Sequence, residues 1–199
     1  MSTRWSLGNM AKNESSIDTK KLAKEFNNLG EGAIVLIETS AEKILEVHLT
    51  AVKWLSDKKY TQIVLSTSRP CKNLLDLYKK NNIDTSKIII LCTVCQEKEK
   101  NKQENSKVIH ISSCASLTEI SLSLSKGMES IKDKKFIFID SINTMLIHNE
   151  PKMLARFIHS ILTKMRTNNV SGLLISLEVD TDKEVRAEIA QLCDKIIKV

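Results

Sequence analysis

The feature that most constrains the fold of this chain is a regular alternation between short apolar runs and longer segments of helical period. The runs are apolar at nearly every position rather than at every second one, which is typical of strands covered on both faces. They lie at residues 33–38, 62–67, 87–92, 107–112, 135–140, 170–177 and 195–199. Helical periodicity predicts helices between them, at 41–56, 72–81, 116–131, 151–167 and 182–192.

Strands separated by helices, with almost no hairpin signal, predict a parallel sheet whose crossovers place helices on both of its faces. We therefore expect an α/β fold of three layers, with a mostly parallel central sheet flanked by helices. The runs at 87–92 and 107–112 are joined instead by a charged stretch without an apolar period, which predicts a solvated loop.

The 199 residues of the chain fit one ordinary domain. Residues 1–17 are polar and lack the apolar core of a secretory signal, so they predict a flexible leader. The single domain is expected to cover 18–199 and to begin with a short amphipathic helix capped by Asp18. No apolar run reaches the length of a membrane span, and we expect a cytoplasmic protein that does not contact a membrane.

The net charge of +6 comes mostly from lysines scattered among glutamates, with few aromatic residues that could stack on bases. This pattern favours solvated helix faces over a nucleic-acid site.

The five cysteines follow no repeating frame, so we expect reduced thiols. Cys92 and Cys95 form a CxxC motif without a second pair, which favours packing over zinc or redox chemistry. The four histidines, among them His48, lack the spacing of a ligand set or triad, which predicts packed or surface side chains.

In an open parallel sheet, ligands bind beyond the carboxyl ends of the strands. Asp140 ends the run "KFIFID" ahead of a predicted short polar turn, and an acid there could orient magnesium or simply accept hydrogen bonds. Arg69 follows another strand and could bind an anion, although a solvent-exposed arginine at a helix start fits equally well. The side chains expected at this edge are Glu38, Thr39, Ser40, Thr67, Ser68, Arg69, Asp140, Ser141, Asn143, Leu177 and Glu178.

The order of the elements resembles that of the RecA-like P-loop ATPases, and within them the KaiC and GvpD type proteins with their largely archaeal relatives. The resemblance runs from about Gly30 to Val199. It rests on "LSTSRP" after the second strand, "FIFIDSINTML" as an acid-ended strand, the helix in "PKMLARFIHSILTKMRTNNVSGLLIS" and the closing "AQLCDKIIKV". It implies a RecA-like sandwich in which a GxxxxGK[ST] loop cradles the phosphates of ATP and the acid orients magnesium.

The stretch that corresponds to the phosphate loop is "IETSAEKI", and it departs from the pattern that the resemblance implies. When it is aligned on Lys43, the glycine positions hold Ile37 and Glu42, and the hydroxyl position holds Ile44. Residues with a side chain resist a positive φ, a carboxylate repels phosphates, and isoleucine cannot bind magnesium. We interpret the stretch as a degenerate Walker A motif.

Two further observations agree with this interpretation. The stretch is typical of the first turns of a helix with Thr39 or Ser40 as its N-cap. In addition, RecA-like enzymes place a catalytic glutamate after the second strand, whereas "STSRP" contains no acid.

We therefore expect a catalytically degenerate RecA-like, KaiC-like domain that does not hydrolyse ATP and acts as a binding, regulatory or assembly module. It would have no catalytic residue, no metal ion and no cofactor, and its partner would be another protein or a second copy. Asp140 would then be structural, accepting hydrogen bonds from turn N–H groups or from Ser141, Asn143 or Lys43.

Two alternatives remain open. One is a divergent ATP-binding protein or weak ATPase, in which Mg-ATP would contact Thr39, Ser40, Lys43, Asp140 and Ser141. The other is a nucleic-acid-binding accessory protein that uses the lysine surplus and Arg69.

Overall fold

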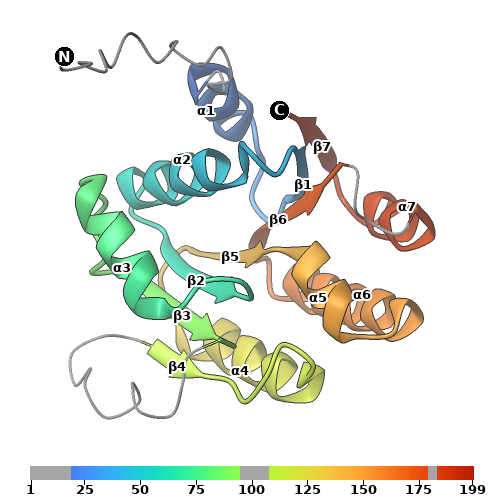
Figure 1. Cartoon of the computed structure of the whole chain (residues 1–199). Coiled ribbons are helices and arrows are strands. Elements are labelled where there is room, and N and C mark those ends of the chain that lie inside the picture. The colour runs from blue at the N-terminus through green and yellow to red at the C-terminus, as the bar shows by residue number, and fades with distance from the viewer. Residues whose placement is uncertain (1–18, 95–107, 179–182) are drawn as a thin grey trace, which may run out of the picture.

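A parallel sheet forms the centre of the molecule (Figure 1). The computed structural model describes residues 19–94, 108–178 and 183–199, and within them the sheet has seven strands in the order β4-β3-β2-β5-β6-β1-β7. The strands are β1 (Ile34–Thr39), β2 (Thr61–Ser66), β3 (Ile88–Cys92), β4 (Val108–His110), β5 (Lys135–Asp140), β6 (Ser171–Leu177) and β7 (Lys195–Lys198). Every pairing among them is parallel. The predicted sheet is confirmed, while the predicted leader and most of the predicted loop before β4 lie outside the described residues.

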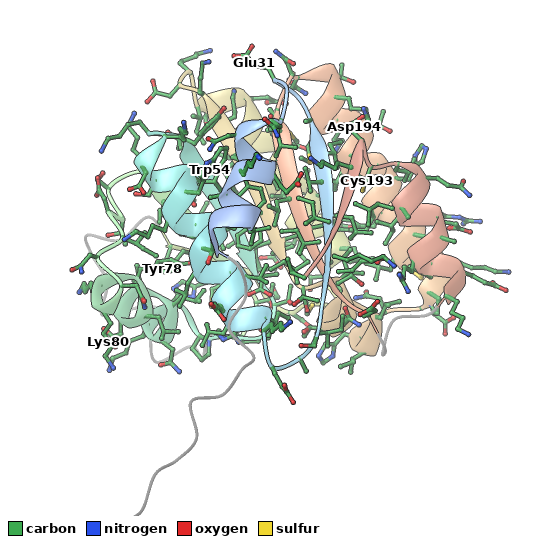
Figure 2. All side chains as sticks on the ribbon, turned by 90° about the horizontal axis from the view of Figure 1, so that it is seen from above. Glu31, Trp54, Tyr78, Lys80, Cys193 and Asp194 are labelled. Carbon is green, nitrogen blue, oxygen red and sulfur yellow. The ribbon has the colours of Figure 1, made fainter. Side chains whose placement is uncertain are left out.

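Helices cover both faces of this sheet. They are α1 (Thr19–Asn27), α2 (Ile44–Asp57), α3 (Cys71–Lys80), α4 (Leu117–Ser130), α5 (Ile142–His148), α6 (Pro151–Thr167) and α7 (Lys183–Gln191). The first three pack on one face and the last four on the other, so that the strands run between two helical layers when seen from above (Figure 2). The predicted three-layer α/β fold is therefore confirmed. Within the described ranges, no helix combines the length and apolarity that a membrane crossing requires.

Strand β5 shows how the two-residue period of a strand supplies both cores. Phe136 and Phe138 pack among residues of α1, α2 and α3, whereas Ile137 and Ile139 pack among those of α4 to α7. Because successive side chains of a strand point to opposite faces, Asp140 shares the face of Phe138. The acid therefore faces the layer that contains α2 and α3, and these helices determine its partners.

The segment after Asp140 differs from the predicted polar turn. It forms helix α5, with Ser141 at the N-cap position. Ile142 and Met145 lie one helical turn apart and are buried in the core that α6 also lines. Tertiary burial stabilises this helix, which is too short to be stable alone or to reveal itself by periodicity.

The expectation of reduced thiols holds for part of the cysteines. Cys71, Cys114 and Cys193 are not part of a disulfide. Cys92, at the end of β3, is disulfide-bonded, so the expectation is wrong at this residue. Its neighbour in the CxxC motif, Cys95, lies outside the described residues.

Candidate functional site

Asp140 lies at the carboxyl end of β5 and is buried, with 1% of its surface exposed. Its Oδ2 atom lies 2.7 Å from Nδ1 of His48, which comes from α2. The same oxygen accepts a longer hydrogen bond, 3.4 Å, from Nη1 of Arg69, in the segment between β2 and α3. The arginine that follows β2 therefore binds an anion of the protein itself.

A second hydrogen bond extends this contact into the core. Nε2 of His48 lies 2.8 Å from the hydroxyl of Tyr78 on α3, and both side chains are fully buried. Burial raises the pKa of Tyr78 and the charge of Asp140 raises it further, so the hydroxyl keeps its proton. Nδ1 of His48 is placed to donate to the carboxylate, and Nε2 and the Tyr78 hydroxyl share the second hydrogen bond. The three side chains form one buried hydrogen-bonded chain.

The sequence predicts Ser141, Asn143 or Lys43 as partners of the Asp140 carboxylate, and this prediction is wrong. The Ser141 hydroxyl pairs with that of Thr144, and the amide oxygen of Asn143 accepts a hydrogen bond from the N–H of Leu177. The physical reason is the strand period, which turns the carboxylate toward α2 and α3.

The backbone between β1 and α2 forms a tight turn. Residues 37–39 belong to β1 and pair with β6, and residues 37–38 also pair with β7. The N–H of Lys43 donates to the carbonyl of Ser40 at 3.1 Å, and the N–H of Val47 donates to the carbonyl of Lys43 at 3.0 Å. The N-cap residue of α2 is Lys43, and its side chain makes no capping hydrogen bond. The prediction of Thr39 or Ser40 as N-cap is therefore wrong. Strand β1 continues to Thr39, whose side chain is buried in the sheet instead.

The five residues predicted to contact Mg-ATP lie at the carboxyl edge of the sheet in two groups. Thr39, Ser40 and Lys43 lie where β1 ends, and Asp140 and Ser141 lie where β5 ends, with β6 between these strands. Ser40 and Lys43 are partly exposed, and the other three are buried. In the ranges that the structure describes, no group of three or more His, Cys, Asp or Glu side chains is arranged to hold a metal ion.

A second buried carboxylate, Glu38 of β1, lies at the same edge and on the face that α7 covers. Its Oε1 atom accepts a short hydrogen bond from Nε of Arg186, and Nζ of Lys198 lies 3.4 Å from its Oε2 atom. Burial alone would raise the pKa of Glu38, but the hydrogen bonds and charges of Arg186 and Lys198 together lower it. The carboxylate is thus held ionised between two cations.

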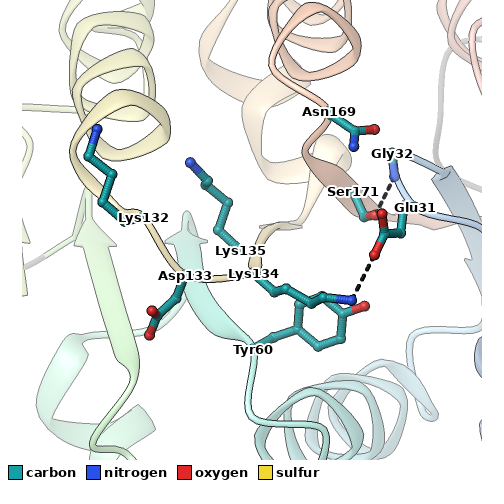
Figure 3. Close-up of a pocket in the computed structure, with 9 residues that line it drawn as sticks. All are labelled: Glu31, Gly32, Tyr60, Lys132, Asp133, Lys134, Lys135, Asn169 and Ser171. Carbon is teal, nitrogen blue, oxygen red and sulfur yellow. Dashed lines mark hydrogen bonds and ion pairs between the residues drawn. The ribbon is translucent and has the colours of Figure 1, made fainter.

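The opposite edge of the sheet contains a separate pocket of about 200 Å³ (Figure 3). Lys134 pairs there with Glu31 at 2.7 Å. The Lys135 ammonium donates at 2.6 Å to the carbonyls of Met128 and Ile131 near the end of α4. Since these two cations bind groups of the protein, the pocket offers a ligand less charge than its lysines suggest. Its lining residues are Glu31, Gly32, Tyr60, Lys132, Asp133, Lys134, Lys135, Asn169 and Ser171, none of which the sequence predicts at the ligand edge.

Sequence reasoning did not single out His48 and Tyr78 as site residues. A local signal exists for His48, which shares the buried face of α2 with Val52 and Leu55 and so fits the predicted packed histidine. Nothing local connects it with Asp140, which is 92 residues away in the sequence.

The strand order, with helices on both faces, is that of an α/β fold of the RecA-like, KaiC-like kind. Two proteins from Pyrococcus horikoshii share this fold in their solved structures. The KaiC-like protein PH0186 is 11% identical, with a TM-score of 0.59 and coverage of 85% of this chain and 72% of its own. The uncharacterized protein PH0321, solved in complex with an unknown peptide, is 12% identical, with a TM-score of 0.68 and coverage of 90% and 82%. The fold that the sequence resemblance implies is therefore confirmed.

The chain belongs to a family of unknown function (DUF7504), whose sequence model matches residues 45–199. The match extends from α2 to β7 and so includes His48, Tyr78 and Asp140. A comparison with curated proteins gives no match.

Proposed function

We propose that this protein is a RecA-like domain that does not hydrolyse ATP and that serves as a binding or assembly module for another protein. The observation that carries the proposal is the engagement of Asp140 by His48 and Arg69. In the ATPases that the sequence resembles, the acid at this strand end acts on magnesium. Here one oxygen of that carboxylate already binds two side chains of the protein, and both compete with a metal ion for it.

The turn after β1 supports the same proposal. A phosphate loop needs several backbone N–H groups that curl around the phosphates. Residues 37–39 instead belong to a strand, and the N–H of Lys43 donates to the carbonyl of Ser40. Glu42 is exposed on this turn, where its charge would repel a phosphate. We therefore interpret the turn as a degenerate Walker A motif.

Support for a protein partner comes from the fold. PH0321, which shares it, was solved with an unknown peptide. A shared fold does not transfer a ligand, so the peptide-binding role of this chain is part of the proposal.

The test is a calorimetric titration of the full chain with Mg-ATP and with Mg-ADP. We expect no saturable binding of either nucleotide and no release of phosphate. Micromolar binding that Lys43→Ala abolishes, and that the exposed control Lys72→Ala retains, would overturn the proposal in favour of a divergent ATP-binding protein. The nucleic-acid alternative predicts salt-dependent retention of single-stranded DNA or RNA, which we do not expect.

A further inference from the structure

Strand β7 forms one edge of the described sheet, beside α1 and α7 (Figure 1). Its inner side pairs with β1, with Leu36 beside Ile196 and Glu38 beside Lys198, and just after it the N–H of Val199 donates to the carbonyl of Glu38. Because the backbone groups of a strand alternate in direction, the N–H and C=O groups of Ile196 and Lys198 point away from β1. In the described part of the chain no strand pairs with that side, which leaves it open to a strand from outside.

A pocket of about 340 Å³ lies on one face of β7, against α7. It is lined by Glu38, Lys183, Arg186, Ala187, Ala190, Ile196 and Lys198. Three of these side chains are cationic and one is anionic, and the anionic Glu38 is contacted by both Arg186 and Lys198, so positive charge remains in excess on this face. Lys183 and Lys198 are exposed. This face therefore favours acidic side chains.

A second pocket, of about 250 Å³, lies on the other face of β7, against α1. It is lined by Leu22, Glu25, Lys195, Ile196, Ile197, Lys198 and Val199. Lys195 pairs with Glu25, so these two charges balance. Leu22, Ile197 and Val199 add apolar surface, and this face therefore favours apolar side chains.

We infer that β7 receives an extended segment of a partner protein in which acidic and apolar side chains alternate. The inference rests on the proposed function, because it names the chemistry of the partner that such a binding module would take. An added strand sends successive side chains to opposite faces, acidic ones toward α7 and apolar ones toward α1. Its backbone bonds to the outward groups of Ile196 and Lys198.

A second copy of this chain fits the edge less well. Strand β7 of such a copy, Lys195–Lys198, contains no acidic side chain and would bring Lys198 to the cationic face against α7. Like charges that face each other across a strand pair destabilise a sheet.

The opposite edge strand provides a matched control. Ile196 on β7 is 44% exposed, and Ile109 on β4 is 43% exposed. An aspartate at either position therefore places the same charge on an edge strand at a similar depth.

The test uses the full chain and a fluorescein-labelled peptide of about eight residues in which valine and glutamate alternate. We expect saturable binding by fluorescence anisotropy that weakens as the salt concentration rises. Ile196→Asp should weaken it by at least about tenfold, whereas Ile109→Asp should leave it unchanged. Lys183→Glu changes the charge on α7 without touching the strand and should also weaken binding, so the test survives if Ile196→Asp folds poorly. In NMR spectra, exchange of the Ile196 and Lys198 amides should slow on binding.

Three results would overturn the inference: no binding of the peptide, equally tight binding of an alternating valine–lysine peptide, or equal effects of Ile196→Asp and Ile109→Asp. A dimer in light scattering that Ile196→Asp dissociates would assign the edge to a second copy and overturn it as well. The nucleotide titration is independent of these measurements. If the peptide does not bind and the nucleotides do not bind either, only the role of β7 is rejected. If a nucleotide binds, the proposed function is rejected.

Discussion

The Nδ1 atom of His48 lies 2.7 Å from the Oδ2 atom of Asp140, and both side chains are buried. This contact joins α2 to the end of β5, and Asp140→Ala would leave His48 and Arg69 without their acceptor. Because breaking a buried pair costs about 3–5 kcal/mol, we expect the free energy of unfolding to fall by that amount. Urea denaturation followed by circular dichroism measures the change.

The matched control for this variant is Asp133, whose carboxylate lies 2.8 Å from the Lys87 ammonium but is 61% exposed. Surface ion pairs contribute about 0–1 kcal/mol, so Asp133→Ala should change the stability little. A loss from Asp140→Ala no larger than that from Asp133→Ala would contradict a structural role for Asp140.

The hydroxyl of Tyr78 provides a second prediction. Tyr78→Phe removes one oxygen and leaves Nε2 of His48 buried without its partner. An unsatisfied buried group costs about 1–3 kcal/mol, and we expect that loss of unfolding free energy in urea. Tyr60→Phe is the control, because the Tyr60 hydroxyl makes no hydrogen bond within the described chain, and its effect should stay within about 0.5 kcal/mol. Equal losses in the two variants would show that the buried chain adds no stability.

The strands could be predicted from the sequence because burial on both faces demands apolar residues throughout. The run at 135–140 coincides with β5, and the segment at 151–167 coincides with α6, which begins at Pro151. Helix α5 was not predictable, because it is short and its stability comes from burying Ile142 and Met145.

The candidate site could be predicted only as an edge of the sheet. Strand ends read from the sequence locate Glu38 and Asp140, since the carboxyl ends of parallel strands meet at one edge. Their partners could not be predicted in this way. His48 is 92 residues from Asp140 and Arg186 is 148 residues from Glu38, so only tertiary packing brings them together.

The ion pairs of Glu38 predict a pH dependence of stability. Burial alone would raise its pKa, but Arg186 and Lys198 lower it below the ordinary value of 4.5. A carboxyl group with a lowered folded pKa stabilises the fold above its unfolded pKa, and this contribution disappears as the pH falls through the folded value. Glu38→Gln should therefore be less stable than the wild type at neutral pH, and the difference should shrink below about pH 4.5.

Urea unfolding over a series of pH values measures this difference for Glu38. Glu42→Gln removes a carboxylate from the exposed turn nearby and controls for the change in net charge. If Glu38→Gln is less stable than the wild type in acid by the same or a larger free energy of unfolding, the ionised form of Glu38 does not stabilise the fold.

The free thiol of Cys193 is predicted to be unreactive in the folded protein. Burial raises its pKa to about 12, the charge of Asp194 adds to this, and the thiol donates to the carbonyl of Ile189 at 3.3 Å. The thiolate is the nucleophile, and an ordinary cysteine has a pKa of about 8.5, so folding lowers the thiolate fraction roughly 10³-fold at about pH 8. Iodoacetamide should label Cys193 far more slowly in buffer than in urea, as mass spectrometry of its peptide measures. Similar rates in the two conditions would mean that the end of α7 opens readily and exposes this thiol.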